Sequence, residues 1–336
     1  MCAHDARRRD DPMTRRVLLF VLGLGVALLV AAAGAEQPRT VPVVGILFAA
    51  AGPDDPLVEA LRRGLRELGY AEGRNIRFEF RGAYGQEDRL PRLAQELVQL
   101  KVDLIVAGTA AAIRATKQAT STIPIVALVH DQDPVSSGLI ESFGRPGSNV
   151  TGIYQRQLEL TAKRLELLKE ALSDLSRVAV FWDSCCPREI AELKPAARQL
   201  GIKLEFMELR APYDFERAFR IAKQKKAGAV IVMFSAGFYV QRVKIGALAL
   251  ENGLPAMGQL RDLTEAGGLM SYGHETQDSF FRLAYFIDRL LKGAKPAELP
   301  VEQVATFNLV VNFRTAKALG VTLPQSILLR ADQVIQ

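Results

Sequence analysis

Short apolar runs alternate along this chain with segments whose apolar residues recur at helical spacing. In the first half we expect strands at Val41–Phe48, Ile76–Phe80, 102–107 and Ile123–Val129, with helices at Leu57–Leu68, Arg89–Leu100 and 110–117 between them. Ile76–Phe80 alternates apolar and charged residues, which is typical of a strand at a sheet edge. Strands joined by helices pair in parallel through right-handed crossovers. The order therefore predicts an α/β fold built on a doubly wound parallel sheet.

The second half repeats the order of elements of the first. Leu90–Ala127 and Phe215–Met257 both run helix, strand, helix, strand. Length agrees with this, since 336 residues with 49% hydrophobic content are enough for about two domains. We therefore expect two similar α/β lobes. A long amphipathic helix at Thr276–Lys292 and an apolar strand at Phe307–Asn312 follow, and periodicity does not assign them to either lobe.

The first 35 residues have the features of an export signal. Arg15-Arg16 precedes the apolar run Val17–Ala33, and Ala33-Gly34-Ala35 is the small-x-small pattern suited to signal peptidase. We expect residues 1–35 to be a signal peptide cleaved after Ala35, which would place the mature protein in the periplasm. The competing interpretation is an uncleaved membrane anchor. Met13, shortly before the Arg pair, is a candidate for the true start.

The basic excess gives little support to nucleic-acid binding. The formal net charge is +6, and residues 1–35 hold five Arg against three Asp, so the rest carries about +4, spread along the chain. Cysteine usage does not indicate a disulfide framework, because only the adjacent Cys185-Cys186 follows the signal segment. This pair could form a vicinal disulfide or remain as two free thiols.

The stretch Val102–Lys117 contains a strand-to-helix turn suited to binding. Its apolar run ends at Gly108-Thr109, and a run of alanines follows directly. Such a turn places the free N–H groups of a helix N-terminus beyond the end of the strand, a geometry suited to a carboxylate or phosphate. Most α/β turns of this kind bind nothing, so both interpretations stay open at this point.

No enzyme motif is present. The sequence lacks Gly-x-Ser-x-Gly, a phosphate-loop Lys-Ser/Thr and His-Glu-x-x-His. His130 and His274 lie far apart, without neighbours at metal-ligand spacing, so we expect no metal and no cofactor. Asp131 and Asp133 could form an acid–base pair, accept hydrogen bonds from a ligand, or serve only the turn before Pro134.

Other strand ends place aromatic and polar residues where α/β proteins bind ligands. These positions are Phe48 after the first strand, Trp182-Asp183 after the strand Val178–Trp182, and Phe234-Ser235 at the end of the strand Ala229–Phe234. The single Trp could instead belong to the core, and both interpretations stay open.

Six segments of the chain resemble one known family when taken together. They are Ser121–Val126, Asp133–Val135, Arg145–Gly152, Lys163–Leu168, Glu265–Gly273 and Ala316–Gly320. As a set they resemble the ABC transporter substrate-binding family that includes tryptophan-binding lipoproteins. The resemblance implies a type I periplasmic-binding fold, in which two lobes joined by a multi-strand hinge close over a small molecule. We then expect lobe 1 to comprise 36–152 plus about 270–305, and lobe 2 to comprise 153–269 plus about 306–336.

The resemblance also implies which residues contact the ligand. The family's Gly-Thr turn matches Gly108, Thr109, Ala110 and Ala111, which would hold a carboxylate on backbone amides. Asp133 would meet an ammonium group. The other expected ligand-binding residues are Phe48, Trp182, Asp183, Ser235, Arg261, Glu265 and Tyr272, the last of them at a hinge.

Three positions depart from the family's usual residues and limit this transfer. They are Ser235, Gly258-Gln259 and Cys185-Cys186, all expected near the cleft. The ligand of a relative therefore cannot be assumed for this chain.

We therefore expect an exported solute-binding protein of an ABC importer, without catalysis, that binds an amino acid or related carboxylate. Phe48, Trp182 and Tyr272 favour an aromatic ligand. The partners would be a permease and its ATPase at the inner membrane, with no nucleic acid, and the protein would be a monomer. The alternatives are a sensor domain that signals to a membrane receptor, and an enzyme on the same scaffold that uses His130, Asp131 and Asp133.

Overall fold

Two β-sheets organise the part of the chain that the structure describes. The computed structural model describes residues 41–50, 52–130, 132–183 and 187–336. The expected signal peptide, Asp131 and Cys185-Cys186 lie outside the described residues. Both sheets belong to one compact unit, Pro42–Gln336.

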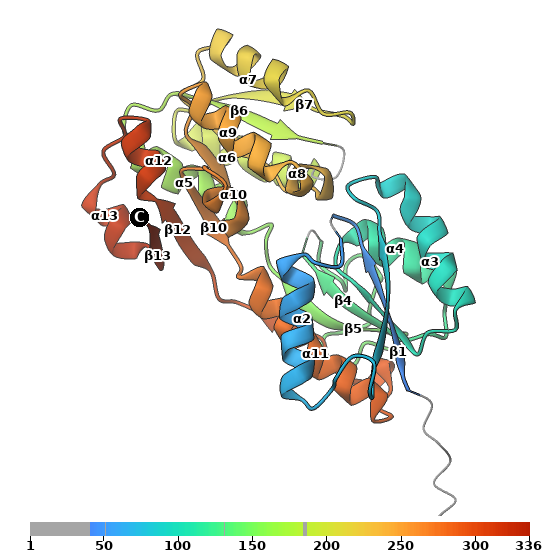
Figure 1. Cartoon of the computed structure of the whole chain (residues 1–336). Coiled ribbons are helices and arrows are strands. Elements are labelled where there is room, and N and C mark those ends of the chain that lie inside the picture. Colours follow the sequence, from blue (N-terminus) through green and yellow to red (C-terminus); the bar gives the residue numbers. More distant parts are fainter. Residues whose placement is uncertain (1–40, 51, 131, 184–186) are drawn as a thin grey trace, which may run out of the picture. The chain divides into compact units, whose positions relative to one another are not determined.

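The first sheet has six parallel strands (Figure 1). They lie in the order β11-β5-β4-β3-β1-β2. Their bounds are β1 Val43–Phe48, β2 Arg77–Gly82, β3 Leu104–Ala107, β4 Ile125–Val129, β5 Val150–Gln155 and β11 Glu302–Val304. The four strands expected in the first half are confirmed, and β2 lies at a sheet edge as expected.

Strand β5 is not predicted by the apolar pattern, because Gly152 interrupts it. Gly152 has a φ of +134°, and a Cβ there would overlap the carbonyl oxygen of Ala127 on β4. Any side chain would therefore force the two strands apart. The glycine that weakens the sequence signal is the residue that allows β5 to pair with β4.

Helices cover both faces of this sheet, with α3 packed beside α4 and α2 packed along α11 (Figure 1). Their bounds are α2 Pro56–Glu67, α3 Leu90–Gln99, α4 Ala110–Ala119 and α11 Thr276–Leu291, with short 3₁₀ turns η1 Glu87–Arg89 and η2 Pro296–Glu298. The N-cap of α2 is Asp55, which accepts a hydrogen bond from the N–H of Leu57 at 3.0 Å. Pro56 at the first helical position and Leu57, Leu61 and Leu65 on the buried side explain why this segment is a helix.

The second sheet has seven strands in the order β13-β12-β10-β9-β8-β6-β7. Their bounds are β6 Arg177–Trp182, β7 Lys203–Glu208, β8 Ala229–Val232, β9 Ala256–Gly258, β10 Met270–Gly273, β12 Asn308–Asn312 and β13 Gln333–Ile335. All neighbours are parallel except β10 and β12, which are antiparallel. The expected α/β class with two mostly parallel sheets is confirmed.

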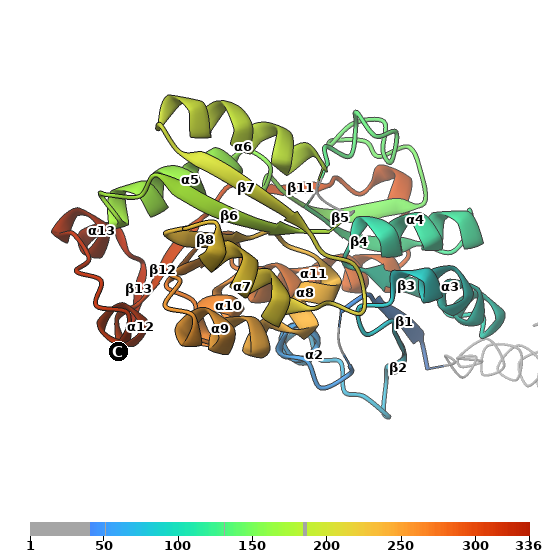
Figure 2. The same cartoon turned by 90° about the horizontal axis from the view of Figure 1, so that it is seen from above.

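Helices cover both faces of the second sheet (Figure 2). Each face has its own hydrophobic core. Val180 of β6 lies in the core that includes α5 and α6, and the next residue, Phe181, lies in the core that includes α7 and α9. This alternation follows from the two-residue repeat of a strand. The helices are α5 Leu160–Ala171, α6 Pro187–Gln199, α7 Phe215–Gln224, α8 Ala236–Val240, α9 Arg242–Glu251, α10 Arg261–Glu265, α12 Phe313–Ala318 and α13 Gln325–Arg330.

The second helix expected within Phe215–Met257 is divided into two in the structure. Gln241 has φ and ψ of −93° and 7°, outside helical values, and it separates α8 from α9. Helix α8 thereby covers 236–240, directly after the turn that follows β8.

The chain passes between the two sheets three times: between β5 and α5, between β10 and α11, and between β11 and β12. We take the six-stranded sheet with its helices as lobe 1 and the seven-stranded sheet with its helices as lobe 2. We propose on this basis that the three connections are at 156–159, 274–275 and 305–307, so that Met270–Gly273 belongs to lobe 2. Among the described residues, no helix is both long enough and apolar enough to span a membrane.

Candidate functional site

The turn after β3 presents a helix N-terminus to a cavity. Thr109 is the N-cap of α4, in extended conformation, and its hydroxyl accepts a hydrogen bond from the N–H of Ala112 at 3.2 Å. The first N–H groups of a helix have no acceptor within the helix, and Ala110 and Ala111 line the cavity wall. This is the geometry that the sequence predicts for the Gly108-Thr109 turn.

The turn after β8 in lobe 2 has the same local conformation. Ser235 is in extended conformation, is 3% exposed, and its hydroxyl accepts a hydrogen bond from the N–H of Phe238 at 3.1 Å. Phe234 and Ala236, on either side of it, line the same cavity as Thr109. The repeated order of elements therefore brings two equivalent strand-to-helix turns to one cavity.

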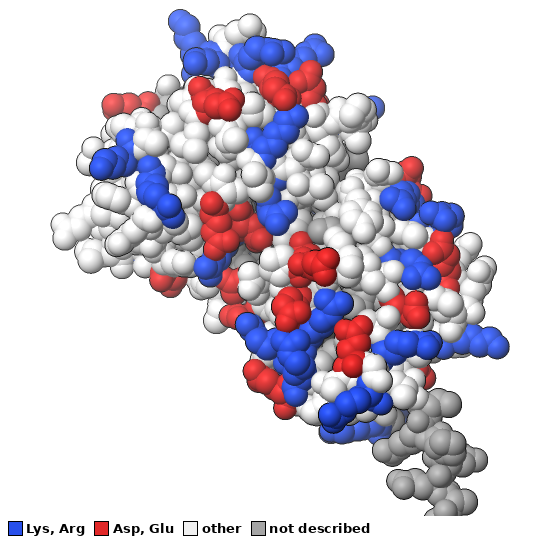
Figure 3. Space-filling view, in the orientation of Figure 1, with Lys and Arg blue, Asp and Glu red and all other residues white. Residues whose placement is uncertain are grey.

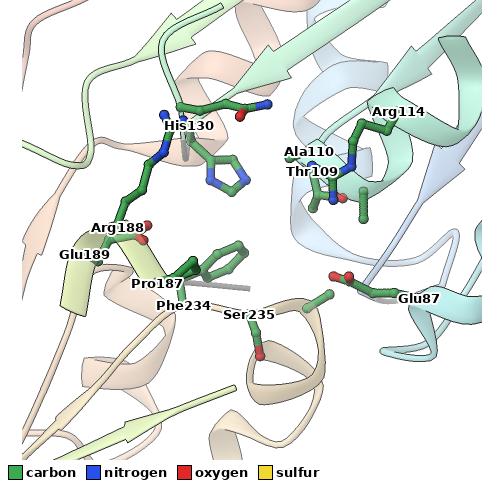
Figure 4. Close-up of a pocket in the computed structure, with 13 residues that line it drawn as sticks. Glu87, Thr109, Ala110, Arg114, His130, Pro187, Arg188, Glu189, Phe234 and Ser235 are labelled. Carbon is green, nitrogen blue, oxygen red and sulfur yellow. The ribbon is translucent and has the colours of Figure 1, made fainter. Parts of the chain in front are cut away.

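This outer cavity has a volume of about 310 Å³, within the range of small-molecule sites. Lobe 1 lines it with Glu87, Thr109, Ala110, Ala111, Arg114, His130 and Gln132, and lobe 2 with Pro187, Arg188, Glu189, Phe234, Ser235 and Ala236. Figure 4 shows Arg114 and Glu87 across the cavity from Arg188 and Glu189. Both lobes thus contribute a positive and a negative side chain.

A smaller inner pocket, of about 30 Å³, adjoins the outer cavity and shares Thr109, His130 and Phe234 with it. Its walls are apolar and aromatic on one side, where Phe48 packs edge-on against Phe280 with ring centroids 5.8 Å apart. Its polar lining residues are Gln155, Gln157, Gln259, Thr276, Thr109, His130 and Tyr239. None of the described residues that line it is Lys, Arg, Asp or Glu.

Gly108 belongs to this inner pocket for a packing reason. A Cβ at Gly108 would lie 3.2 Å from the Cζ atom of Phe280, which is tighter than an ordinary contact. The absence of a side chain therefore lets the aromatic wall approach the end of β3.

A buried arginine lies behind the inner pocket. Arg164 of α5 is 3% exposed; its Nε donates to the carbonyl oxygen of Tyr272 at 2.7 Å and its Nη2 donates to Oε1 of Gln157 at 2.6 Å. Burial lowers the pKa of Arg164 to about 10, while the charge of Glu189 raises it, so the guanidinium stays charged at neutral pH. Arg164 thus joins Gln157, in the connection after β5, to the end of β10, next to the connection that follows that strand.

The structure brings six of the expected site residues to these cavities. The outer cavity is lined by Thr109, Ala110, Ala111 and Ser235, and the inner pocket by Phe48, Gly108 and again Thr109. The other six expected residues line neither cavity: Asp133, Trp182, Asp183, Arg261, Glu265 and Tyr272.

Local partners account for the positions of those six. The Asp133 carboxylate accepts hydrogen bonds from the N–H groups of Val135 and Ser136 at 2.9 and 2.7 Å, which is the turn role that the sequence left open. The two α10 residues Arg261 and Glu265 form an ion pair at 2.5 Å.

The two residues at the end of β6, and Tyr272 on β10, also have partners elsewhere. Trp182 packs against the core that holds α5 and α6, and Asp183 accepts a hydrogen bond from the hydroxyl of Tyr213 at 3.4 Å. The ring of Tyr272 packs against Phe307, with centroids 6.1 Å apart.

Several lining residues are not predicted from the sequence. Arg114 lies four residues after Ala110 and therefore on the same face of α4. Helical periodicity could have predicted this position. Arg188 and Glu189 lie in the first turn of α6. The glutamines of the inner pocket lie in or beside connecting segments, where no periodic pattern points to them.

Charged residues outside the cavities are mixed in sign. On the face shown in Figure 3, Lys and Arg side chains lie among Asp and Glu side chains. In the described residues no group of three His, Cys, Asp or Glu side chains is arranged to hold a metal ion.

Comparison with solved structures shows the same fold in other proteins. A conserved domain protein from Vibrio cholerae O1 biovar El Tor is 25% identical, with a TM-score of 0.78, over 88% of this chain and 100% of that one. An ABC domain from Streptococcus pneumoniae, solved in complex with L-Trp, is 24% identical, with a TM-score of 0.76, over the same shares.

Comparison of sequences identifies the family. A tyrosine-binding protein from Clostridioides difficile (strain R20291) is 23% identical over 276 residues, which are 79% of this chain and 78% of that protein. The family model described as ABC transporter substrate binding protein matches residues 48–335. This chain therefore belongs to the ABC transporter substrate-binding protein family.

Proposed function

We propose that this chain is the exported solute-binding protein of an ABC importer and binds an amino acid or related carboxylate, with an aromatic side chain preferred. The observation that carries the proposal is the outer cavity, in which each lobe contributes a positive and a negative side chain around about 310 Å³. A zwitterionic ligand matches such a wall, because charged groups that leave water need partners of opposite charge.

The carboxylate end of the ligand has a suitable place at the start of α4. The N–H groups of Ala110 and Ala111 point from a helix N-terminus, where the helix dipole favours negative charge, and Arg114 adds a full positive charge on the same face. In this proposal the carboxylate binds there, and the ammonium group lies near Glu87 or Glu189.

The preference for an aromatic ligand has two supports. Phe234 and His130 line the outer cavity, with ring centroids 5.2 Å apart in an edge-to-face arrangement, and an aromatic wall of this kind favours an aromatic ligand. The related protein from Clostridioides difficile is named as tyrosine-binding, and the Streptococcus pneumoniae structure holds L-Trp.

Ligand contacts to both lobes would couple binding to transport. A ligand that touches Thr109 in lobe 1 and Ser235 in lobe 2 stabilises the arrangement in which the lobes are together. The permease then would distinguish loaded from empty protein by that arrangement. No step in this cycle requires chemistry on the ligand.

A thermal-shift screen tests the proposal. The panel holds the twenty amino acids, benzoates, purines, nucleosides and neutral sugars, with isothermal titration calorimetry for each hit. We expect amino acids or aromatic carboxylates to raise the melting temperature, with tyrosine or tryptophan among the strongest. A response confined to neutral sugars or nucleosides would reject the carboxylate assignment.

The importer role is tested separately in cells. Deletion of the gene should abolish uptake of the radiolabelled ligand, and the wild-type gene on a plasmid should restore it. Normal uptake with a lost transcriptional or chemotactic response would instead assign the chain to a sensor.

A further inference from the structure

Three polar side-chain atoms of the inner pocket have no hydrogen-bond partner. They are Nε2 of His130, Nε2 of Gln157 and Oγ1 of Thr276, each with almost no exposed surface, and their residues line the pocket. Buried polar groups without partners are rare in folded proteins and cost stability. Three of them around one small pocket indicate that a polar group completes it.

The orientation of the Gln157 amide is fixed by its neighbour. The Arg164 guanidinium has only donors, so the atom of Gln157 that it meets at 2.6 Å is the carbonyl oxygen Oε1. Gln157 is 2% exposed, and its –NH₂ group is therefore the part left for the pocket. Contact with a charged donor also polarises the amide and strengthens its own N–H groups as donors.

The available donors define the missing group. The amide nitrogen of Gln157 can only donate, whereas the Thr276 hydroxyl and His130 Nε2 can donate or accept according to their hydrogens. An oxygen atom with two lone pairs satisfies this set. A ligand group with donors alone would leave the Gln157 amide unsatisfied.

The uncharged lining and the small volume of the inner pocket further limit which ligand group it can hold. No described Lys, Arg, Asp or Glu lines the inner pocket, whereas the outer cavity has four such residues, so a charged ligand group is better placed outside. A volume of about 30 Å³ suffices for about two water molecules, which is enough for a terminal hydroxyl or carbonyl but too small for a ring.

We propose that the inner pocket binds a neutral oxygen at the end of the ligand opposite its charged groups, and that Gln157 selects for this oxygen by donating to it. Arg164 is a positioning residue that holds the amide in the donating orientation. This inference rests on the proposed function, because it assumes that the rest of the ligand occupies the outer cavity. The ligand class is then an amino acid or carboxylate with a distal hydroxyl or carbonyl, such as a phenol.

The test compares L-tyrosine with L-phenylalanine, which differ by one such oxygen, in wild type, Gln157→Leu and Gln199→Leu. Leu removes the donor with little change of size, and Gln199 is an exposed residue of α6 that serves as the control. We expect wild type and Gln199→Leu to bind L-tyrosine at least roughly tenfold more tightly than L-phenylalanine, as one satisfied buried donor allows. In Gln157→Leu that ratio should fall toward one while the affinity for L-phenylalanine is retained.

Equal wild-type affinities for the two amino acids, or a ratio unchanged in Gln157→Leu, would overturn the inference and leave the proposed function standing. Arg164→Lys, which keeps the charge but loses the planar geometry, should reduce the ratio without abolishing L-phenylalanine binding. An unchanged ratio in this variant would remove the positioning role of Arg164.

A second readout keeps the two proposals separable if no amino acid binds. Crystals are soaked in phenol and, as the control, in toluene. An ordered phenol oxygen within hydrogen-bond distance of Gln157 Nε2, without ordered toluene, would support the inner pocket although the amino-acid assignment had failed. No ordered phenol in such crystals would overturn the inner pocket as well.

Discussion

Asp55 is a buried carboxylate at the contact between the lobes, and its replacement by Asn should stabilise the protein at neutral pH. Its oxygens, in lobe 1, lie 3.3 Å from the hydroxyl of Tyr239 in lobe 2, and the same hydroxyl lies 3.1 Å from Oδ1 of Asp262. One hydroxyl proton cannot serve both carboxylates fully. Burial raises the pKa of Asp55, against the N–H of Leu57, the charge of Arg242 and the Tyr239 hydroxyl, which lower it, and the charge of Asp262 raises it further.

Asn at position 55 would satisfy every group in this cluster. Its oxygen can still cap α2 by accepting from the N–H of Leu57, and its –NH₂ can donate to the Tyr239 oxygen, which leaves the Tyr239 proton for Asp262. Replacing a poorly compensated charge by one additional hydrogen bond should raise the free energy of unfolding by about 1 kcal/mol. For a chain of this size that corresponds to a rise in melting temperature of about 2–4 °C.

The pH dependence follows from the raised pKa of Asp55. A carboxyl whose folded-state pKa lies above the ordinary 3.8 contributes stability that is present below that value and is lost as the pH rises through the raised pKa. As the pH falls, the wild type should therefore become more stable relative to Asp55→Asn. The difference in melting temperature between the two proteins should disappear near pH 4.

The control for this measurement is Asp214→Asn. Asp214 is also a helix N-cap, accepting from the N–H of Arg217 at 2.9 Å, but it is exposed. Both variants lose the interaction of a charge with a helix dipole, so their difference isolates the buried cluster. Differential scanning calorimetry from pH 4 to pH 8 measures both. An Asp55→Asn variant less stable at pH 7 than Asp214→Asn would refute the reasoning.

Three further predictions concern the ligand cavity, a buried histidine and one strand pair. Arg114→Met should weaken binding of the best ligand by at least roughly tenfold in calorimetry, through loss of a charge-assisted contact. Arg220→Met, at an exposed position of α7, should leave the affinity unchanged, and equal effects of the two substitutions would remove Arg114 from the site. The imidazole NMR signals of His274 should not titrate between pH 5 and 8. Burial lowers the pKa of His274 to about 4, although the hydrogen bond from its Nδ1–H to the Thr306 carbonyl at 2.8 Å acts in the opposite direction. A titration midpoint near 6.5 would contradict this prediction. In urea unfolding, Gly152→Ala should lose about 3 kcal/mol or more of stability, because its Cβ would overlap Ala127. The control Gly253→Ala should lose about 1 kcal/mol, because only its φ of +67° opposes the substitution. Similar losses in the two variants would argue against the overlap.

The sequence predicts much of the fold, because the pattern that marks the elements also drives their packing. Apolar residues at helical spacing in α2 and α3 and continuous apolar runs in β1, β3 and β4 leave few other ways to bury them. The pattern fails where another requirement dominates. Gly152 breaks the apolar run of β5 but is needed for close pairing, and β11 and β13 have only three residues each.

The sequence predicts the candidate site residues that lie directly after the carboxyl end of a strand. Thr109 and Ser235 lie at equivalent turns and meet at the outer cavity, as the strand-end rule predicts. Trp182 also ends a strand, but the alternation along β6 directs its ring to the α5–α6 core. Asp133 is held by its own turn.

The inner pocket could not be predicted in this way. Gln157, Gln259 and Thr276 are far apart in sequence and lie in or next to segments without periodicity. They meet only because the chain passes between the lobes more than once. Tertiary topology, rather than local pattern, brings these side chains together.

The most direct test of the central claim is a crystal structure of the protein with the strongest ligand from the thermal-shift panel. We predict the ligand in the outer cavity, with its carboxylate on the N–H groups of Ala110 and Ala111 and with contacts to lobe 2 at Phe234 or Ser235. A ligand that lies outside this cavity, or that contacts one lobe only, would contradict the account.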